Sequence, residues 1–221
     1  MMEIIGHRGC AGQCPENTVT AVKRASKYVD AVEVDVRRCG SGELVVFHDE
    51  TVDRLTDGSG LVSELTWSEL QSLEVMDSGE SIPHLDDVLD AFPSDVRAQL
   101  ELKDEDVAAD LERIVTGYDL DVAVSSFEPR ALRQVNEREW AVETGYLFET
   151  DPMEGLQSAV ELGCHNVHPH YDLCLETDIV DAAHDRDLGV IAWKAARTEQ
   201  EIAELQAAGV DGVTADRWDI A

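Results

Sequence analysis

The sequence contains few positive charges. Only 17 of its 221 residues are lysine or arginine, against 47 aspartate and glutamate residues, so the formal net charge is −30 at pH 7. Nucleic acids and anionic membranes bind basic protein faces, so we expect neither as a partner and no stable membrane association. The acids are spread along the whole chain, which argues against an acidic tail. Their spread favours a halophilic protein, because a dense acidic surface keeps a protein soluble in a very salty cytoplasm.

Long apolar runs and a disulfide-like cysteine pattern are also missing. No apolar run approaches the length that spans a membrane, and a strand pattern already begins at Ile4. We therefore expect no signal peptide and a cytoplasmic protein. The five cysteines are odd in number, which is typical of reduced thiols. For Cys10 and Cys14, a redox role and simple packing both stay open.

Short β-branched runs alternate with amphipathic stretches along the whole chain, which we expect to form one catalytic domain over residues 1–221. The strand-like runs cover residues 4–6, 31–36, 44–47, 98–102, 122–125, 142–148, 166–168, 190–193 and 212–214. Helical patterns cover residues 18–27, 85–92, 107–118, 129–138, 152–162, 177–187 and 199–208. Repeated β-then-α units predict a parallel sheet covered by helices, either a closed barrel or a doubly wound sheet.

Two observations favour the α/β fold of a (β/α)8 TIM barrel. No Gly-x-Gly-x-x-Gly motif opens the first helix, so a dinucleotide-binding sheet loses its main support. Reactive side chains also follow several successive strands, as they do in barrel active sites. Nine strand-like runs compete for eight places, and we expect one of the late runs to be an extension or a loop. Residues 51–81 lack clear strands and are expected to form a small insertion above the barrel, after the third strand.

Charged side chains mark the ends of the first four strands. They are His7 and Arg8, then Glu33 and Asp35, then His48, then Glu101 and Lys103. A charged side chain on a buried strand is costly unless it is paired or binds a metal. Because the carboxyl ends of barrel strands share one rim, we expect these side chains to lie together in a single site.

The three carboxylates predict a metal site. Glu33, Asp35 and Glu101 would offer only oxygen ligands, which suit Mg²⁺ or Ca²⁺ better than zinc. Such an ion accepts a phosphate oxygen and stabilises the charge that grows there during the reaction.

The histidines and the two cations complete this chemistry. His7 and His48 can act as a general base and a general acid on either side of a phosphorus atom. Arg8 and Lys103 can neutralise the remaining phosphate oxygens.

The position of His48 depends on a short link. Only about seven residues separate the second and third strands, too few for a crossover helix, which needs roughly ten or more. If Glu33, Asp35 and His48 share one rim, we expect the link around residues 39–42 to return extended. A simple β-hairpin is the alternative, and we expect it to place His48 at the opposite end of the strands.

Short motifs built around these residues run in order through nearly the whole chain. They are His7-Arg8-Gly9, Pro15-Glu16-Asn17-Thr18, Glu33-Val34-Asp35, His48-Asp49, Arg54-Leu55-Thr56, Gly58-Ser59-Gly60, Ile82-Pro83-His84-Leu85, Leu100-Glu101-Leu102-Lys103, Ser126-Phe127 and residues 209–216. In these motifs the sequence resembles the glycerophosphodiester phosphodiesterase family. Together the motifs are highly specific.

The resemblance implies a barrel of the phospholipase C-like phosphodiesterase type. It implies Glu33, Asp35 and Glu101 as ligands of Mg²⁺ or Ca²⁺, and His7 and His48 as the acid–base pair. The implied substrate is a small glycerophosphodiester of lipid metabolism, hydrolysed to sn-glycerol 3-phosphate and an alcohol. The implied route is attack by the substrate's own glycerol hydroxyl, which gives a cyclic phosphate that water then opens. Whether the chain forms a homo-oligomer stays open.

One stretch departs from the family. Members usually carry Trp-Thr-Val-Asn on a late strand, where this chain has Trp193-Lys194-Ala195-Ala196. We expect Trp193 and Phe127 to contact the substrate. Lys194 either points outwards or adds a phosphate contact, so the departure bears on the choice of substrate more than on the chemistry.

The residues after Pro15 allow two interpretations, a structural one and a functional one. Glu16 and Asn17 are expected to cap and open the first helix, since polar residues favour that position. An active-site role for them would be to hold Arg8 or its loop.

Two other functions stay open. One keeps the barrel and the metal but acts on lysophospholipids or cyclic phosphodiesters. The segment 51–81 lacks the exposed apolar helix that a membrane-acting enzyme would need, which counts against a lipid substrate. The other is a barrel that only binds a phosphorylated ligand, but such a barrel is expected to have lost a histidine or a carboxylate, and here all are present.

Overall fold

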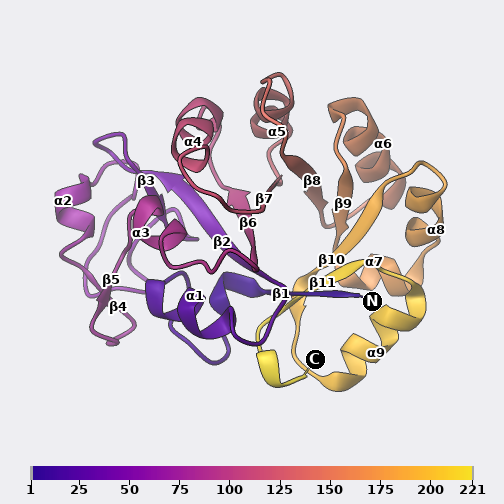
Figure 1. Cartoon of the computed structure of the whole chain (residues 1–221), viewed down its shortest axis with the longest axis horizontal. Coiled ribbons are helices and arrows are strands. Elements are labelled where there is room, and N and C mark those ends of the chain that lie inside the picture. Colours follow the sequence, from indigo (N-terminus) through magenta and orange to yellow (C-terminus); the bar gives the residue numbers. More distant parts are fainter. Residues whose placement is uncertain (1, 221) are drawn as a thin grey trace.

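A closed barrel of eight parallel strands forms the centre of the computed structural model, which describes residues 2–220 (Figure 1). Its strands are β1 Glu3–Gly6, β2 Ala31–Arg38, β6 Arg97–Leu102, β7 Val122–Ser126, β8 Glu143–Phe148, β9 Asn166–Pro169, β10 Gly189–Ala196 and β11 Gly212–Ala215. Strand β1 pairs with both β2 and β11, and this double pairing closes the sheet. The predicted (β/α)8 barrel is confirmed.

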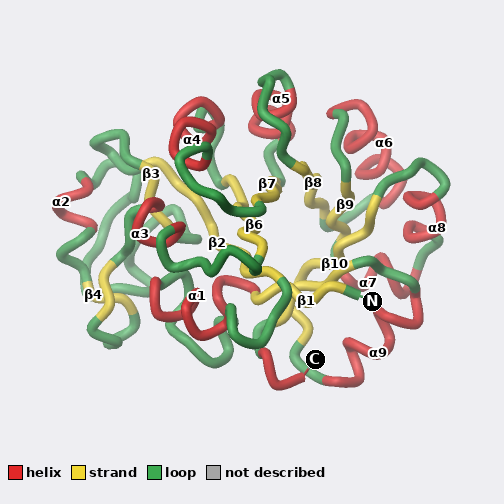
Figure 2. Tube along the Cα trace, in the orientation of Figure 1, coloured by secondary structure: helices red, strands yellow, loops and turns green. Residues whose placement is uncertain are grey.

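Helices surround the barrel on its outer side (Figures 1 and 2). They are α1 Val19–Ala25, α3 Leu85–Leu89, α4 Ala108–Val115, α5 Pro129–Asn136, α6 Pro152–Leu162, α7 Tyr171–Glu176, α8 Ile179–His184 and α9 Glu199–Ala208, with 3-10 turns at His7–Gly9 and Trp218–Ile220. Helix α7 was not predicted, and its start is set by the His170 ring, which accepts a hydrogen bond from the Asp172 N–H. Within residues 2–220, no helix has the length and apolar character needed to cross a membrane.

The surplus strand is β3, Leu44–Val46, which runs antiparallel to β2 outside the closed barrel. The expectation that one of the late runs is surplus was therefore wrong, since β9, β10 and β11 all belong to the barrel. The physical reason is the length of the link between β2 and β3. Without room for a crossover helix, the chain returns as a hairpin.

This hairpin nevertheless brings His48 to the carboxyl rim. Strand β2 continues for three residues past Asp35 as far as Arg38, and β3 returns beside that overhang with Val46 opposite Val36. The Phe47 N–H then donates to the Asp35 carbonyl over 2.9 Å. The extended return was the wrong expectation. The hairpin is correct, but its expected consequence, His48 at the opposite end, was also wrong.

The segment from residue 51 to residue 81 follows β3 and contains regular structure. It holds helix α2, Trp67–Leu70, and an antiparallel pair of short strands, β4 Glu74–Val75 and β5 Glu80–Ser81. Buried apolar side chains from this segment pack with those of β3 and its flanks in one cluster, which comprises Cys39, Val45, Phe47, Val52, Leu55, Val62, Leu70, Val75 and Ile82. Because Phe47 belongs to this cluster, the segment anchors the chain next to His48.

Candidate active site

The first histidine lies where β1 ends and the chain turns sharply. Arg8 adopts a left-handed φ of 50°, and Gly9 follows with a φ of 74°. A side chain on Gly9 would place its Cβ 2.6 Å from the Cβ of Ala21, so only glycine fits there. This turn presents His7 at the rim, where its Nδ1 lies 2.8 Å from Oδ1 of Asp216.

Asp216 comes directly after β11, the neighbour of β1 in the closed barrel. Its second carboxylate oxygen accepts a hydrogen bond from Nε of Arg197 over 3.1 Å. Burial would raise the pKa of Asp216, but its bonds to His7 and Arg197 hold that pKa below the ordinary value. His7 therefore faces an ionised carboxylate that fixes its ring.

The second histidine has the same kind of support. Nδ1 of His48 lies 2.6 Å from Oδ1 of Asp49, and Arg54 donates to both oxygens of Asp49 over 2.6 and 2.8 Å. The bond from Arg54 holds the pKa of Asp49 at about 2. Since a carboxylate engages Nδ1 of each histidine, Nε2 is the ring nitrogen left for proton transfer.

Three buried carboxylates lie at the same rim. Glu33 and Asp35 come from β2, and Glu101 lies opposite Asp35 on β6. One oxygen of each lies within 4.8 Å of the others, and no other such group of three possible metal ligands occurs within residues 2–220. Oε1 of Glu33 is buried and accepts no hydrogen bond from the described residues. An all-oxygen donor set with an unpartnered buried oxygen fits a hard divalent cation.

Two cations contact this carboxylate cluster. Nζ of Lys103 lies 2.9 Å from Oδ1 of Asp35 and also bonds to Glu101. Nε of Arg8 lies 3.2 Å from Oδ2 of Asp35, and the Arg8 backbone N–H donates to Glu33 over 2.8 Å. The structure therefore places Arg8 and Lys103 beside the three carboxylates, where they offset part of the negative charge.

The environment separates the two carboxylates of β2. Burial would raise the pKa of Asp35, but the charges of Lys103 and Arg8 outweigh burial and hold that pKa well below its usual range. Burial and the charge of Asp35 instead raise the pKa of Glu33. A bound cation would therefore favour the ionised form of Glu33.

Glu16 and Asn17 hold the site instead of capping helix α1. The N-cap is Thr18, whose hydroxyl accepts from the Ala21 N–H over 3.1 Å, so the capping expectation was wrong. The amide of Asn17 is engaged by Asp35, because it donates to Oδ2 over 2.7 Å and accepts from the Asp35 N–H over 3.1 Å.

Glu16 links the two arginines of the rim. Its Oε1 accepts from Arg8 over 2.8 Å and from Arg54 over 3.0 Å. Arg54 in turn holds Asp49, so the supports of Arg8 and His48 form one connected network. The contacts of Glu16 match the alternative expectation that it holds Arg8 in the active site.

An aromatic wall forms another side of the rim. Trp193 of β10 packs edge-on against Phe127, with ring centroids 5.0 Å apart, and against His170 at 5.1 Å. Its indole N–H donates to the Phe148 carbonyl over 2.9 Å, which fixes the ring. A small cavity of about 30 Å³ lies beside this wall, and its lining includes His7, Glu33, Glu101, Trp193 and Lys194.

Cys10 and Cys14 lie behind the His7 turn as buried, free thiols. Burial raises the pKa of Cys10 to about 12. Its thiol therefore stays protonated and unreactive at neutral pH, which favours packing over a redox role.

Asp49 and Asp216, which orient the two histidines, are not among the predicted site residues. Asp49 directly follows His48, and Asp216 directly follows the last barrel strand. For Asp49 the available signal was a carboxylate next to a predicted acid–base histidine, and for Asp216 it was a carboxylate directly past a barrel strand.

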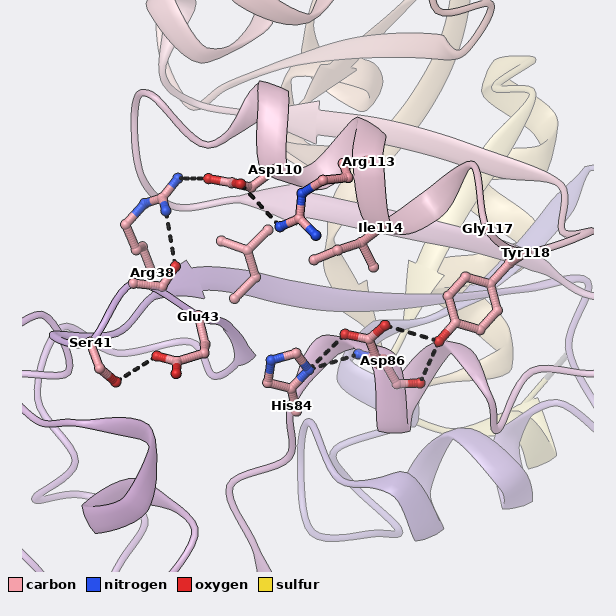
Figure 3. Close-up of a pocket in the computed structure, with 12 residues that line it drawn as sticks. Arg38, Ser41, Glu43, His84, Asp86, Asp110, Arg113, Ile114, Gly117 and Tyr118 are labelled. Carbon is pink, nitrogen blue, oxygen red and sulfur yellow. Dashed lines mark hydrogen bonds and ion pairs between the residues drawn. The ribbon is translucent and has the colours of Figure 1, made fainter.

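A larger, open groove of about 800 Å³ lies outside the barrel, beside β3, α3 and α4 (Figure 3). Its charged side chains satisfy one another: Arg38 and Arg113 both pair with Asp110, and His84 pairs with Asp86. It lacks the group of buried carboxylates found at the barrel mouth. We therefore place the active site at the carboxyl rim of the barrel.

A barrel that gathers two aspartate-bound histidines and three buried carboxylates at its carboxyl rim has the architecture of the (β/α)8 enzymes. The chain belongs to the glycerophosphoryl diester phosphodiesterase family, whose model matches residues 7–220. It is 30% identical over 228 residues to the glycerophosphodiester phosphodiesterase of Caldanaerobacter subterraneus subsp. tengcongensis, covering 96% of this chain and 93% of that protein. The protein is accordingly an enzyme, a phosphoric diester hydrolase.

Solved structures agree with this assignment. A phosphodiesterase of Oleispira antarctica, solved in complex with the product sn-glycerol-3-phosphate, superposes with a TM-score of 0.89 at 27% identity over 99% of this chain and 94% of that one. The glycerophosphodiester phosphodiesterase of Agrobacterium tumefaciens has the same fold, with a TM-score of 0.86 at 24% identity over 100% and 98% of the two chains.

Proposed function

We propose that the protein hydrolyses glycerophosphodiesters to sn-glycerol 3-phosphate and an alcohol, with Mg²⁺ or Ca²⁺ held by Glu33, Asp35 and Glu101. The observation that carries this proposal is the meeting of three buried carboxylates with two aspartate-supported histidines at one barrel rim. The product bound to the Oleispira antarctica relative supports the same chemistry. A divalent cation at the carboxylates supplies a Lewis acid for a phosphate oxygen.

The surroundings of the two histidines indicate their roles. Burial and the nearby charges of Lys103 and Arg8 lower the pKa of His48 despite the opposing effect of Asp35, so His48 is neutral near pH 7. Burial alone would lower the pKa of His7, but the hydrogen bond to Asp216 and the charge of Glu33 raise it above the ordinary value. His48 is therefore the base of the first step, and His7 is the acid.

With these roles, two chemical steps return both histidines to their starting protonation states. His48 takes the proton of the substrate's glycerol hydroxyl, whose oxygen bonds to phosphorus, while His7 gives its proton to the leaving alcohol. A cyclic phosphate results, with His48 protonated and His7 neutral. His7 then takes a proton from the attacking water, and His48 returns its proton to the glycerol oxygen as the ring opens. Both histidines end in their starting states, as a catalytic cycle requires.

We expect a bell-shaped dependence of kcat/KM on pH. Activity requires neutral His48, so it rises as the pH passes the lowered pKa of His48. It also requires protonated His7, so it falls as the pH passes the raised pKa of His7. Replacing Asp216 by asparagine removes the carboxylate that raises the pKa of His7, so the falling limb should move to lower pH. Rate measurements from pH 4.5 to 9 test this, and a falling limb that stays in place contradicts the assignment.

We expect EDTA to abolish the release of sn-glycerol 3-phosphate, and Mg²⁺ or Ca²⁺ to restore it. The reason is that Oε1 of Glu33 is buried and has no hydrogen-bond partner among the described residues, so a bound cation would supply its missing partner. The assay uses a panel of glycerophosphodiesters, with lysophospholipids and cyclic phosphodiesters as competing substrates. Full activity in EDTA would overturn the metal requirement, and faster cleavage of a competing substrate would overturn the substrate class.

The same assay is run in dilute buffer and in molar KCl. A protein with a net charge of −30 repels an anionic diester at low ionic strength. At 1 M salt the Debye length is about 3 Å, so only cations next to the substrate still act on it. We therefore expect the highest kcat/KM in concentrated KCl.

A further inference from the structure

Lys194 places an ammonium group on the aromatic wall of the active site. Its side chain is exposed, and its Nζ lies 5.9 Å from the centre of the Tyr171 ring, within the range of a cation–π contact. The other cations of the rim are all bound to carboxylates, namely Arg8, Lys103, Arg54 and Arg197. Among the described residues, no carboxylate lies within ion-pair distance of Lys194. Its charge is therefore available to a ligand.

The backbone of β10 is irregular where it carries this lysine. Lys194 has a left-handed φ of 78°, and the pairing of β10 with β11 shifts register between Ala192 and Ala196. Successive side chains of a regular strand point to opposite faces, so Trp193 and Lys194 would normally be separated. A bulge re-aims side chains. Here the irregularity lets both consecutive residues line the cavity that also contains His7 and Glu33.

The aromatic residues of this wall would otherwise suit a positively charged ligand. The Trp193 ring packs edge-on against both Phe127 and His170, and the Tyr171 ring lies tilted beside His170 with ring centroids 5.2 Å apart. Faces of such rings attract quaternary ammonium groups. In this chain the ammonium of Lys194 already lies over the Tyr171 ring, so a second cation meets repulsion there, whereas an anion meets an unpaired positive charge.

We propose that Lys194 selects glycerophosphodiesters whose alcohol part carries a further negative charge, and disfavours those with a quaternary ammonium group. The proposal rests on the proposed function and names the substrate class of that same site. The negative group of the alcohol would contact Nζ of Lys194, while the diester phosphate lies at the carboxylate cluster. Lys194 is thus a specificity residue and takes no part in the proton transfers.

The test compares kcat/KM for three diesters whose alcohols carry a positive charge, no charge and a negative charge. They are glycerophosphocholine, glycerophosphoglycerol and glycerophosphoglycerol phosphate, assayed with the metal and KCl concentrations that give the highest activity. We expect the wild-type enzyme to prefer glycerophosphoglycerol phosphate, whose alcohol is anionic, over glycerophosphocholine, whose alcohol is cationic. The preference should be roughly tenfold, as a single unpaired charge next to the ligand would provide. Lys194→Gln should remove this preference, and Lys194→Glu should reverse it.

Lys27→Glu is the matched control. Lys27 is also an exposed lysine, but it lies between α1 and β2, at the amino-terminal end of the barrel strands. The Lys27→Glu substitution changes the net charge by the same amount as Lys194→Glu and should leave the substrate order of the wild type unchanged. Thermal melts establish that all variants are folded, and kcat/KM for glycerophosphoglycerol, whose alcohol part is uncharged, reports their basal activity.

The outcomes separate the two proposals. If the wild type cleaves none of the three diesters, the proposed function fails. If it cleaves them but without a preference for the anionic one, or if Lys194→Glu keeps the wild-type order, the role of Lys194 is overturned while the function stands. If Lys27→Glu shifts the order as much as Lys194→Glu, the preference comes from overall charge and the proposal is equally overturned.

Discussion

Replacing His48 by glutamine is expected to lower kcat by about 10²–10⁴-fold, the usual contribution of a positioned general acid or base. Glutamine keeps a polar side chain but cannot take a proton from the attacking hydroxyl. Because His48 is not part of the proposed metal site of Glu33, Asp35 and Glu101, KM and metal affinity should change little. Steady-state kinetics with saturating metal measure the effect. A calcium or magnesium titration of the variant verifies that the carboxylate cluster is intact.

His184→Gln provides the matched control. Nε2 of His184 lies 2.9 Å from Oδ2 of Asp211, so this histidine also has an aspartate partner. Asp211 precedes β11, however, at the end of the barrel opposite to the active site. The His184 variant should keep wild-type rates. A kcat for His48→Gln within a few-fold of the wild type would show that His48 moves no proton in the rate-limiting step.

The barrel and the carboxylate cluster could be predicted because they depend on local patterns. Glu33 and Asp35 are two residues apart in an apolar run, which places both on one face of a strand. Glu101 occupies the same level on the next parallel strand, and parallel strands of a barrel end at one rim. These arguments need only the period of a strand and the direction of its neighbours.

The position of His48 could not be predicted because it depends on how far β2 extends. Val36, Arg37 and Arg38 continue the strand beyond the rim, so the hairpin turns above the active site instead of level with it. The sequence shows that the link is too short for a crossover, but it contains no measure of the overhang. The return of β3 along this overhang is what brings His48 down to Asp35.

The support of His7 depends on closure of the whole barrel. His7 and Asp216 are 209 residues apart and meet only because β1 pairs with β11. The choice of N-cap was similarly undetermined, since asparagine and threonine both favour that position. Asn17 is unavailable because its amide is bound to Asp35, and that contact belongs to tertiary structure.

Replacing Asp35 by asparagine is expected to have the largest combined effect on metal binding and stability. Asp35 is fully buried and ion-pairs with Lys103 at 2.9 Å and with Arg8 at 3.2 Å. Asparagine removes one of the proposed metal ligands and leaves both cations with less opposing charge. Breaking a buried pair from one side costs roughly 3–5 kcal/mol. Because Glu101 still faces Lys103 and Glu16 still faces Arg8, we expect a loss near 3 kcal/mol, the lower end of that range.

Chemical denaturation at several pH values tests the electrostatic origin of this loss. The pKa of Asp35 is held below its usual value in the folded protein, so its ion pairs stabilise the fold above the unfolded pKa of about 3.9. That stabilisation disappears as the pH falls towards the lower, folded pKa. The difference in unfolding free energy between wild type and Asp35→Asn should therefore be constant from pH 5 to 8 and shrink below pH 4.

Asp121→Asn is the control for this experiment. Asp121 also pairs with an arginine, Arg97, but its side chain is 65% exposed, and exposed pairs contribute no more than about 1 kcal/mol. Divalent metal at 100 times its Kd should stabilise the wild type and the Asp121 variant by about 2.7 kcal/mol, and Asp35→Asn by far less. Equal stabilisation of all three proteins would exclude Asp35 as a ligand. A loss of stability as small as that of the control would mean that Arg8 and Lys103 do not depend on Asp35 for their counter-charge.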